Sequence, residues 1–431
     1  TGVSVGQDSI VKIYGSEGKI VVESPWFCHG SDAGESTIEV HKGGDVETIT
    51  CSSDKGIYAL EADVLANNIA NRQAPSPAMS WGDSLGNAST LDQWIAAVGV
   101  DYPSNRQSAY TTTLSKEPLK VSDDAPMIYG ELPGVNKKIS RLVMGMDNQM
   151  TISHATAMFD DFFARGGNTF DTAFIYAGGL QERLFGQWVE NRGNREDVIL
   201  IDKGAHTPYC LPECIGEQLK ISLERLGFDY TDIYFMHRDN LDVPIGEFVD
   251  ALNDLKDQGL MNAFGGSNWS LPRIKEFNEY AAANGKTGFA AVSNNFSLAQ
   301  MVDPVWGGCI ASSTAEFRAF HEESQVALFP WSSQARGFFV PERSAPDKLD
   351  DEELARCWYS DENFQRQARC FELAKKYDTH PVCINLAYVL HQKFPIFPLI
   401  GPRLISETAS TMNGLAVSLT DDEVKYLNLE D

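Results

Sequence analysis

The sequence predicts an α/β fold, in which a (β/α)8 TIM barrel follows a partial α+β sheet domain. Two observations predict the barrel. Short apolar runs that end in polar residues recur about every 30 residues, as strands do when they alternate with helices. The intervals between the runs are amphipathic, as helices that cover a parallel sheet are. The first 105 residues show a different pattern, with closely spaced alternating segments that are typical of antiparallel strands.

Residues 1–105 are expected to form the partial sheet domain. In KIYGSEGKIVV, two alternating segments flank a turn in which Gly15 and Gly18 supply unusual backbone angles. Ser80 is a suitable cap for the second of two helices. Residues 106–125 are polar and aperiodic, which indicates a linker. The expected elements are a strand–turn–strand unit at Lys12–Val22, strands at Thr37–Val40 and Val46–Cys51, and helices at Ile57–Arg72 and Trp81–Val98.

Residues 126–431 are expected to form the barrel. Two segments, 296–326 and 336–351, are long loops at the mouth, where such loops clamp ligands. Two helical stretches precede the eighth strand. The expected strands are Leu142–Met146, Thr169–Asp171, Val198–Lys203, Asp232–Met236, Ala263–Ser267, Ala290–Asn294, Val326–Trp331 and Ile396–Ile400. The expected helices are His154–Arg165, Glu182–Glu190, Pro212–Leu226, Ile245–Gln258, Leu271–Asn284 and Asp421–Leu427.

Polar residues follow the predicted strands in four motifs: FDTAFIY, IDKGAH, FMHRDN and FGGSNW. The loops after the strands of such a barrel converge on one mouth. The first three motifs bring Asp171 with Tyr176, Lys203 and His237 to that mouth. In this order and at these places, the four residues resemble the catalytic set of the aldo-keto reductase family, and the resemblance extends from about Pro126 to the C-terminus.

The resemblance implies an NAD(P)-dependent oxidoreductase that transfers hydride between a nicotinamide and a carbonyl/alcohol substrate. Carbonyl reduction creates an alkoxide that must be protonated, and Tyr176 is the implied acid. Lys203 is expected to lower the tyrosine pKa from its reference value of about 10. Asp171 would keep Lys203 charged, and His237 would orient the substrate oxygen.

The resemblance also implies a binding site for NAD or NADP around the later strand ends. Ser267 and Asn268 match the carboxamide-binding pair, Ser293 replaces a usual glutamine, and Phe296 occupies the place of a stacking aromatic residue. A carboxylate at Glu407 would repel a 2′-phosphate, so NADH is expected to serve at least as well as NADPH. The remaining residues expected around the phosphates are Ser332, Gln334, Arg336 and Gly337 after the seventh strand and Gly401 and Arg403 after the eighth, before a helix start.

The substrate pocket is expected to be lined by polar and aromatic residues near the catalytic set. Aromatic side chains at a barrel mouth are as often part of the packing as of a pocket. The expected substrate contacts are Asn148, Tyr176, His237 and Trp269, and Phe174, Tyr209 and Trp331 are candidates for the pocket wall.

The run from GSEGKIVV to LDQWIAAVG resembles the C-terminal portion of the glucose-fructose oxidoreductase/inositol dehydrogenase/MocA group. No GxGxxG motif opens a βαβ unit before residue 130, so only part of such a domain is expected. A sugar-like substrate is a further expectation from this resemblance. Two alternatives to an active reductase are a cofactor-binding regulatory or scaffold subunit and a fragment of a bifunctional sugar oxidoreductase fusion.

Composition excludes several other functions. The net charge of −25 disfavours nucleic acid and anionic membranes as partners, and no apolar run is long enough to span a bilayer. No signal peptide is recognised at the start, and eight irregularly spaced cysteines indicate reduced thiols, so a cytoplasmic protein is expected. Self-association into a homo-oligomer is left open. His206, Cys210 and Cys214 lack a second pair for zinc, and no metal is expected.

Overall fold

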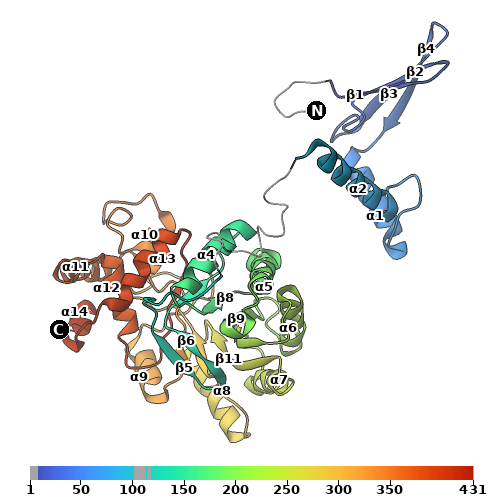
Figure 1. Cartoon of the computed structure of the whole chain (residues 1–431). Coiled ribbons are helices and arrows are strands. Elements are labelled where there is room, and N and C mark those ends of the chain that lie inside the picture. Colours follow the sequence, from blue (N-terminus) through green and yellow to red (C-terminus); the bar gives the residue numbers. More distant parts are fainter. Residues whose placement is uncertain (1–7, 101–112, 114–117, 431) are drawn as a thin grey trace. The chain divides into compact units, whose positions relative to one another are not determined.

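The computed structural model describes residues 8–100, 113 and 118–430. Its chain divides into two compact units, Thr1–Pro103 and Ser104–Asp431 (Figure 1).

The N-terminal unit is an antiparallel sheet followed by two helices. Its four strands pair in chain order, and Lys12 lies opposite Val21 in the first hairpin. The Ser80 hydroxyl accepts the Asp83 backbone N–H, and the Asp83 carboxylate accepts the Ser80 N–H, so the expected cap of the second helix is confirmed. The elements are β1 (Ile10–Tyr14), β2 (Gly18–Glu23), β3 (Gly34–Lys42), β4 (Asp45–Ser53), α1 (Ile57–Asn68) and α2 (Trp81–Val98).

This unit buries few of its apolar side chains. Neither α1 nor α2 contains a buried residue. Trp26, Trp81 and Trp94 are each 65% exposed. Isolated apolar side chains are normal at a protein surface. So many of them in one small unit make the surface of this unit unusually apolar.

The second unit is the predicted barrel of eight parallel strands. The sheet closes on itself between β13 and the segment just before β14: Leu328 and Ile396 form a parallel bridge, and the Phe397 N–H donates to the Leu328 carbonyl. The order around the barrel is β14, β7, β8, β9, β10, β11, β12, β13. The strands are β7 (Val143–Gly145), β8 (Thr169–Asp171), β9 (Ile199–Gly204), β10 (Thr231–Met236), β11 (Met261–Ser267), β12 (Ala291–Ser293), β13 (Ala327–Leu328) and β14 (Leu399–Ile400).

Helices surround the strands on the outside of the barrel (Figure 1). Three further helices separate β13 from β14, one more than expected. The helices are α4 (Ile152–Ala164), α5 (Leu180–Arg192), α6 (Pro212–Leu226), α7 (Ile245–Asp257), α8 (Leu271–Ala283), α9 (Ala315–Ser324), α10 (Glu352–Trp358), α11 (Asp361–Lys376), α12 (Pro381–Leu390), α13 (Ile405–Met412) and α14 (Asp421–Leu427).

A hairpin, β5 (Tyr129–Leu132) and β6 (Val135–Ser140), covers the N-terminal end of the barrel. Leu132 and Ile139 of this hairpin belong to the same buried cluster as the inward side chains of the strands. The opposite, C-terminal end is therefore the accessible mouth. No helix in the described part of the chain is long and apolar enough to cross a membrane.

Candidate active site

A buried ion pair joins the ends of two neighbouring strands. Asp171 ends β8 and Lys203 lies in β9, and the Lys203 Nζ is 2.5 Å from the Asp171 Oδ1 and 3.0 Å from the Thr172 carbonyl oxygen. Both charged residues are 3% exposed. Burial alone lowers the pKa of Lys203, but the attractions of Asp171 and Tyr176 outweigh it, and the pKa is raised. Lys203 therefore carries its charge in the barrel.

Tyr176 lies on a tight turn after β8. The following residue, Ala177, has a φ of 41°, a left-handed conformation that turns the chain toward α5. The Lys203 Nζ is 5.3 Å from the centre of the Tyr176 ring. The rings of Tyr176 and His237 meet edge to face with centroids 5.9 Å apart. The structure therefore brings the four predicted catalytic residues together.

The pKa of Tyr176 differs in direction from the prediction. Burial of the hydroxyl raises the pKa to about 12, and the nearby Lys203 lowers it by less than burial raises it. Lys203 thus acts in the expected direction but does not bring the pKa below its reference value. The consequence is a phenol that is fully protonated at neutral pH and can donate its proton.

His237 follows β10 and is fixed by its backbone, since its N–H donates to the Gly204 carbonyl at 2.6 Å. Burial lowers its pKa well below the usual value, and the positive charges of Lys203 and Arg238 lower it further. The imidazole is therefore neutral. Its buried Nδ1 has no hydrogen-bond partner among the described residues. A neutral imidazole has one N–H to donate, which suits the predicted contact with a substrate oxygen.

A second histidine lies beside the first. The rings of His206 and His237 are 5.0 Å apart and nearly perpendicular. His206 ends the IDKGAH motif, so its position after β9 can be read from the sequence, although its place beside His237 was not predicted.

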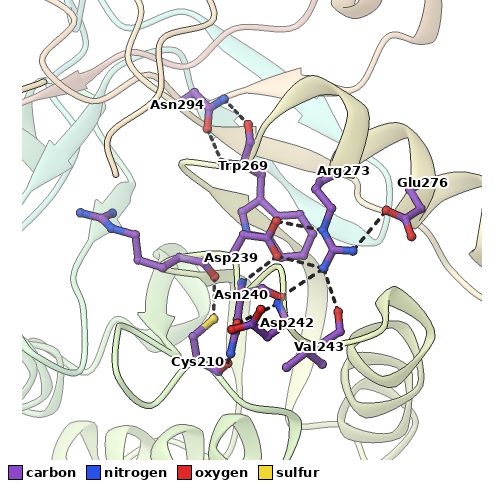
Figure 2. A network of polar contacts seen from close by, with 10 residues as sticks. Cys210, Asp239, Asn240, Asp242, Val243, Trp269, Arg273, Glu276 and Asn294 are labelled. Carbon is purple, nitrogen blue, oxygen red and sulfur yellow. Dashed lines mark hydrogen bonds and ion pairs between the residues drawn. The ribbon is translucent and has the colours of Figure 1, made fainter. Parts of the chain in front are cut away.

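The loop that follows His237 is held by an arginine of α8. Arg273 donates to both carboxylate oxygens of Asp239, at 3.0 and 3.2 Å, and to the Val243 carbonyl at 3.2 Å (Figure 2). Bidentate pairing of this kind fixes orientation as well as distance. The same network includes the Cys210 thiol, which donates to the Arg238 carbonyl at 3.0 Å.

Burial raises the pKa of the Cys210 thiol to about 12, so the thiol keeps the proton that it donates to the Arg238 carbonyl.

Three residues predicted to hold a carboxamide lie together at the ends of β11 and β12. The Ser267 hydroxyl donates to the Ser293 carbonyl at 2.8 Å, and the Asn268 amide donates to the Ser267 hydroxyl at 3.1 Å. The Asn268 side-chain oxygen accepts the Ile310 N–H at 3.2 Å, which joins the site to the loop after β12. The Ser293 hydroxyl is buried and has no partner among the described residues.

Two predicted aromatic contacts are corrected by their burial. Phe296 is 0% exposed, and its ring lies parallel to that of Tyr388 at 6.0 Å, inside the core between the barrel and α12. Trp269 is also 0% exposed and packs on Phe289, with ring centroids 5.0 Å apart. A fully buried ring offers no face to a ligand. Trp331, one of the residues predicted for the pocket wall, follows β13 and is partly exposed.

The segment after β13 makes a tight turn. Ser332 and Arg336 have φ values of 49° and 52°, and Gly337 has a φ of 91°. Arg336 forms an ion pair of 2.8 Å with Glu353. Gln334 is partly exposed in the same turn. The one candidate cation of this segment is therefore already paired.

The loop after β14 contains the remaining candidates. The Glu407 carboxylate accepts the Arg403 backbone N–H at 2.7 Å, so it serves as part of the cap of α13. Asn148 bridges this loop, because its amide donates to the Gly401 carbonyl at 2.9 Å and its oxygen accepts the Arg403 Nε–H at 3.1 Å. Asn148 was predicted to contact the substrate, but its side chain binds the loop predicted to hold phosphate.

Comparison with known proteins identifies the family of the barrel. Residues 141–429 match the Aldo/keto reductase family. A norsolorinic acid reductase of Aspergillus flavus is 27% identical over 305 residues, which cover 66% of this chain and 73% of that protein. An aryl-alcohol dehydrogenase [NADP(+)] of Phanerodontia chrysosporium is 26% identical over 298 residues, which cover 63% of this chain and 74% of that protein.

The fold is also found in a thermostable aldo-keto reductase crystallised with the inhibitor epalrestat. The two structures align with a TM-score of 0.55 and 19% sequence identity, over 71% of this chain and 100% of that chain. With the barrel, the four strand-end residues and the match to residues 141–429 taken together, this chain belongs to the aldo/keto reductase family and is an NAD(P)H-dependent oxidoreductase.

Proposed function

We propose that the enzyme reduces an aryl aldehyde or ketone, or oxidises the corresponding alcohol, with Tyr176 as the proton donor. The observation that carries this proposal is the buried Lys203–Asp171 pair beside Tyr176 and the neutral His237. Tyr176 holds the proton that the alkoxide needs, and His237 donates a hydrogen bond that orients the carbonyl oxygen. Lys203 stabilises the phenolate that remains after proton transfer.

The residues at β11 and β12 suit a nicotinamide. The orphaned Ser293 hydroxyl, with Ser267 and Asn268 beside it, offers donors and acceptors that a carboxamide can satisfy. Arg403 would approach a phosphate at the start of α13. A bound reduced nicotinamide supplies the hydride. We assign the stacking surface to Trp331 in place of the buried Phe296.

An aromatic substrate is supported by the residues around the mouth and by a relative named for aryl alcohol. Tyr209 follows β9 and is 60% exposed, whereas the ring of Phe174 is covered by the Arg225 guanidinium, 4.5 Å from its centre. Trp306, 53% exposed, meets Trp331 with ring centroids 5.9 Å apart. These flat apolar surfaces match an aryl ring better than a polyol.

The runner-up is a sugar-like substrate. It depends on the predicted resemblance of residues 1–105 to sugar dehydrogenases, which the family match to residues 141–429 does not support. A regulatory or scaffold subunit is disfavoured by the complete catalytic set. We also infer a cytoplasmic location from the cysteines, all eight of which are free thiols.

The test is the oxidation of NADPH and NADH in the presence of benzaldehydes and keto-sugars, for the wild type and Tyr176→Phe. Loss of the acid should lower kcat for the aryl aldehydes by about 10²–10⁴-fold. Isothermal titration calorimetry should show unchanged cofactor affinity, because only the hydroxyl is removed. A variant that keeps more than about a tenth of the wild-type kcat excludes Tyr176 as the acid.

A further inference from the structure

A buried arginine adjoins the catalytic histidine. Arg238 directly follows His237 at the end of β10 and is 9% exposed. Its charge is close enough to lower the pKa of His237. The mechanism proposed above gives this cation no role.

Arg238 has no carboxylate partner in the described residues 8–100, 113 and 118–430. The adjacent carboxylate, Asp239, is held by both of its oxygens in the bidentate contact with Arg273 (Figure 2). A buried charge without a counter-ion is costly, and proteins usually pair it. The neighbouring carboxylate, Asp239, is paired with Arg273 and not with Arg238.

Most of the donors of Arg238 are also free. One Nη1 N–H donates to the His237 carbonyl at 3.0 Å, and Nη2 approaches the Cys309 sulfur at 4.0 Å, a weak acceptor. A guanidinium has five N–H groups, so three find no protein acceptor among the described residues. Beside it, Gly307 and Gly308 leave open space, since a Cβ on Gly308 would still lie 3.9 Å from the Arg238 Nε.

Arg238 lies across the barrel from the candidate phosphate residues that follow β14. In the closed strand order, β10 is four strands from β14 in either direction, so the two lie on opposite sides of the barrel. The candidate phosphate residues Gly401 and Arg403 follow β14, across the mouth from Arg238. Arg238 therefore adjoins His237, the residue proposed to orient the substrate oxygen, and is distant from the β14 part of the candidate phosphate site.

We propose that Arg238 is the anchor for a carboxylate on the substrate, so that the preferred substrates are carbonyl compounds that carry a carboxylate near the reacting group. The planar fork of a guanidinium fits a carboxylate with two parallel hydrogen bonds. This inference rests on the proposed aryl carbonyl reductase function and narrows its substrate class. The anchor binds and orients the substrate and takes no part in proton transfer.

The test compares 2-, 3- and 4-formylbenzoate with the corresponding formylbenzamides, which have nearly the same shape without the charge. At least one formylbenzoate should have a kcat/KM about tenfold or more above that of its amide. Arg238→Gln should abolish this preference, because it should lower kcat/KM for the formylbenzoate about tenfold more than for its amide. Arg238→Lys keeps the charge but not the planar fork, so it should retain part of the preference for the carboxylate. If the glutamine variant does not fold, the lysine variant is compared with the wild type instead. The matched control is Arg165→Gln, whose arginine ends α4 at the other end of the barrel and pairs with Asp161.

Binding measured without turnover separates this inference from the proposed function. Benzoate should raise the Tm of the wild type more than benzamide does, and Arg238→Gln should remove the difference. If benzoate is preferred but no aldehyde is reduced, the proposed function fails and the anchor stands. If the aldehydes are reduced without preference for any formylbenzoate, or if Arg238→Gln keeps the preference, the anchor is overturned and the proposed function stands. Weaker NADPH binding by Arg238→Gln with an unchanged carboxylate preference would likewise overturn it.

Discussion

At the scale of single residues, the protonation states of Tyr176 and His237 define the working pH range. Burial holds the tyrosine pKa at about 12 and holds the histidine pKa well below its usual value. Between pH 7 and 9, the tyrosine is therefore protonated and the histidine neutral. We expect kcat for reduction to be flat over this range and to fall only on acidification, as His237 gains a proton.

Alcohol oxidation should behave differently, because it needs the phenolate as a base. Its rate should rise with pH as the phenolate fraction rises below the raised pKa. Pre-steady-state rates in both directions from pH 6 to 10 check this, since they isolate the chemical step. A reduction rate that falls tenfold between pH 7 and 9 would contradict the assigned states.

A second residue-scale prediction concerns the Lys203–Asp171 pair. Lys203→Met should abolish activity and also lower the free energy of unfolding by about 3–5 kcal/mol, because Asp171 is left as a buried unpaired carboxylate. The double variant Lys203→Met/Asp171→Asn should recover much of that stability but no activity. Urea unfolding with parallel activity assays measures both. Equal stability of the single and double variants would show that the pair has no structural role.

The residue scale also shows the limits of sequence reasoning. Asp171 and Lys203 were predicted to meet, because adjacent parallel strands bring their ends together whatever the side-chain packing. The burial of Phe296 and Trp269 depends on which way each ring turns and on what α12 and the helices beside β11 present to it. The raised pKa of Tyr176 depends on how far burial outweighs one charge. A strand-end motif predicts neither the burial of these rings nor the pKa of the tyrosine.

At the scale of elements, most barrel boundaries followed from hydrophobic periodicity, and proline accounts for two of the exceptions. The structure has β13 end at Leu328 and β14 begin at Leu399, whereas longer strands were expected. Pro330 and Pro398 cannot donate to a ladder, which shortens both strands. The helices α6 and α14 match the predicted ranges because each has a clear start signal, a proline in the first and an acidic first turn in the second.

The element-scale prediction concerns Glu407 at the start of α13. Its carboxylate caps the helix and places a negative charge beside Arg403, so NADH should be used at least as well as NADPH. Glu407→Arg should shift the kcat/KM ratio toward NADPH and should cost about 0.5–2 kcal/mol of stability through the lost cap. Glu407→Gln is the matched control, since glutamine retains the capping acceptor without the charge. A wild-type preference of about tenfold for NADPH would refute the assignment.

At the scale of the whole molecule, the residues proposed for chemistry and binding all lie in the second unit. Deleting residues 1–110 should leave a barrel that unfolds cooperatively and binds cofactor with unchanged affinity. The buried Thr113 is retained in this truncation. Calorimetric unfolding and cofactor titration of the truncated and full-length proteins provide the measurement. Loss of cooperative unfolding would show that the N-terminal unit completes the barrel.

The uneven burial of tryptophan gives the two units different optical signatures. Trp188, Trp269 and Trp358 are less than 2% exposed in the barrel, whereas Trp26, Trp81 and Trp94 are each 65% exposed in the N-terminal unit. Indole emission moves to longer wavelength when the ring meets water. The three buried tryptophans of the barrel should therefore emit at the blue edge and shift to the red on unfolding, while the exposed Trp306 and the N-terminal tryptophans emit at the red edge throughout. Subtracting the spectrum of the truncated protein from that of the full-length chain isolates the light emitted by the first 110 residues, and any blue emission in that difference would report that their rings are shielded from water.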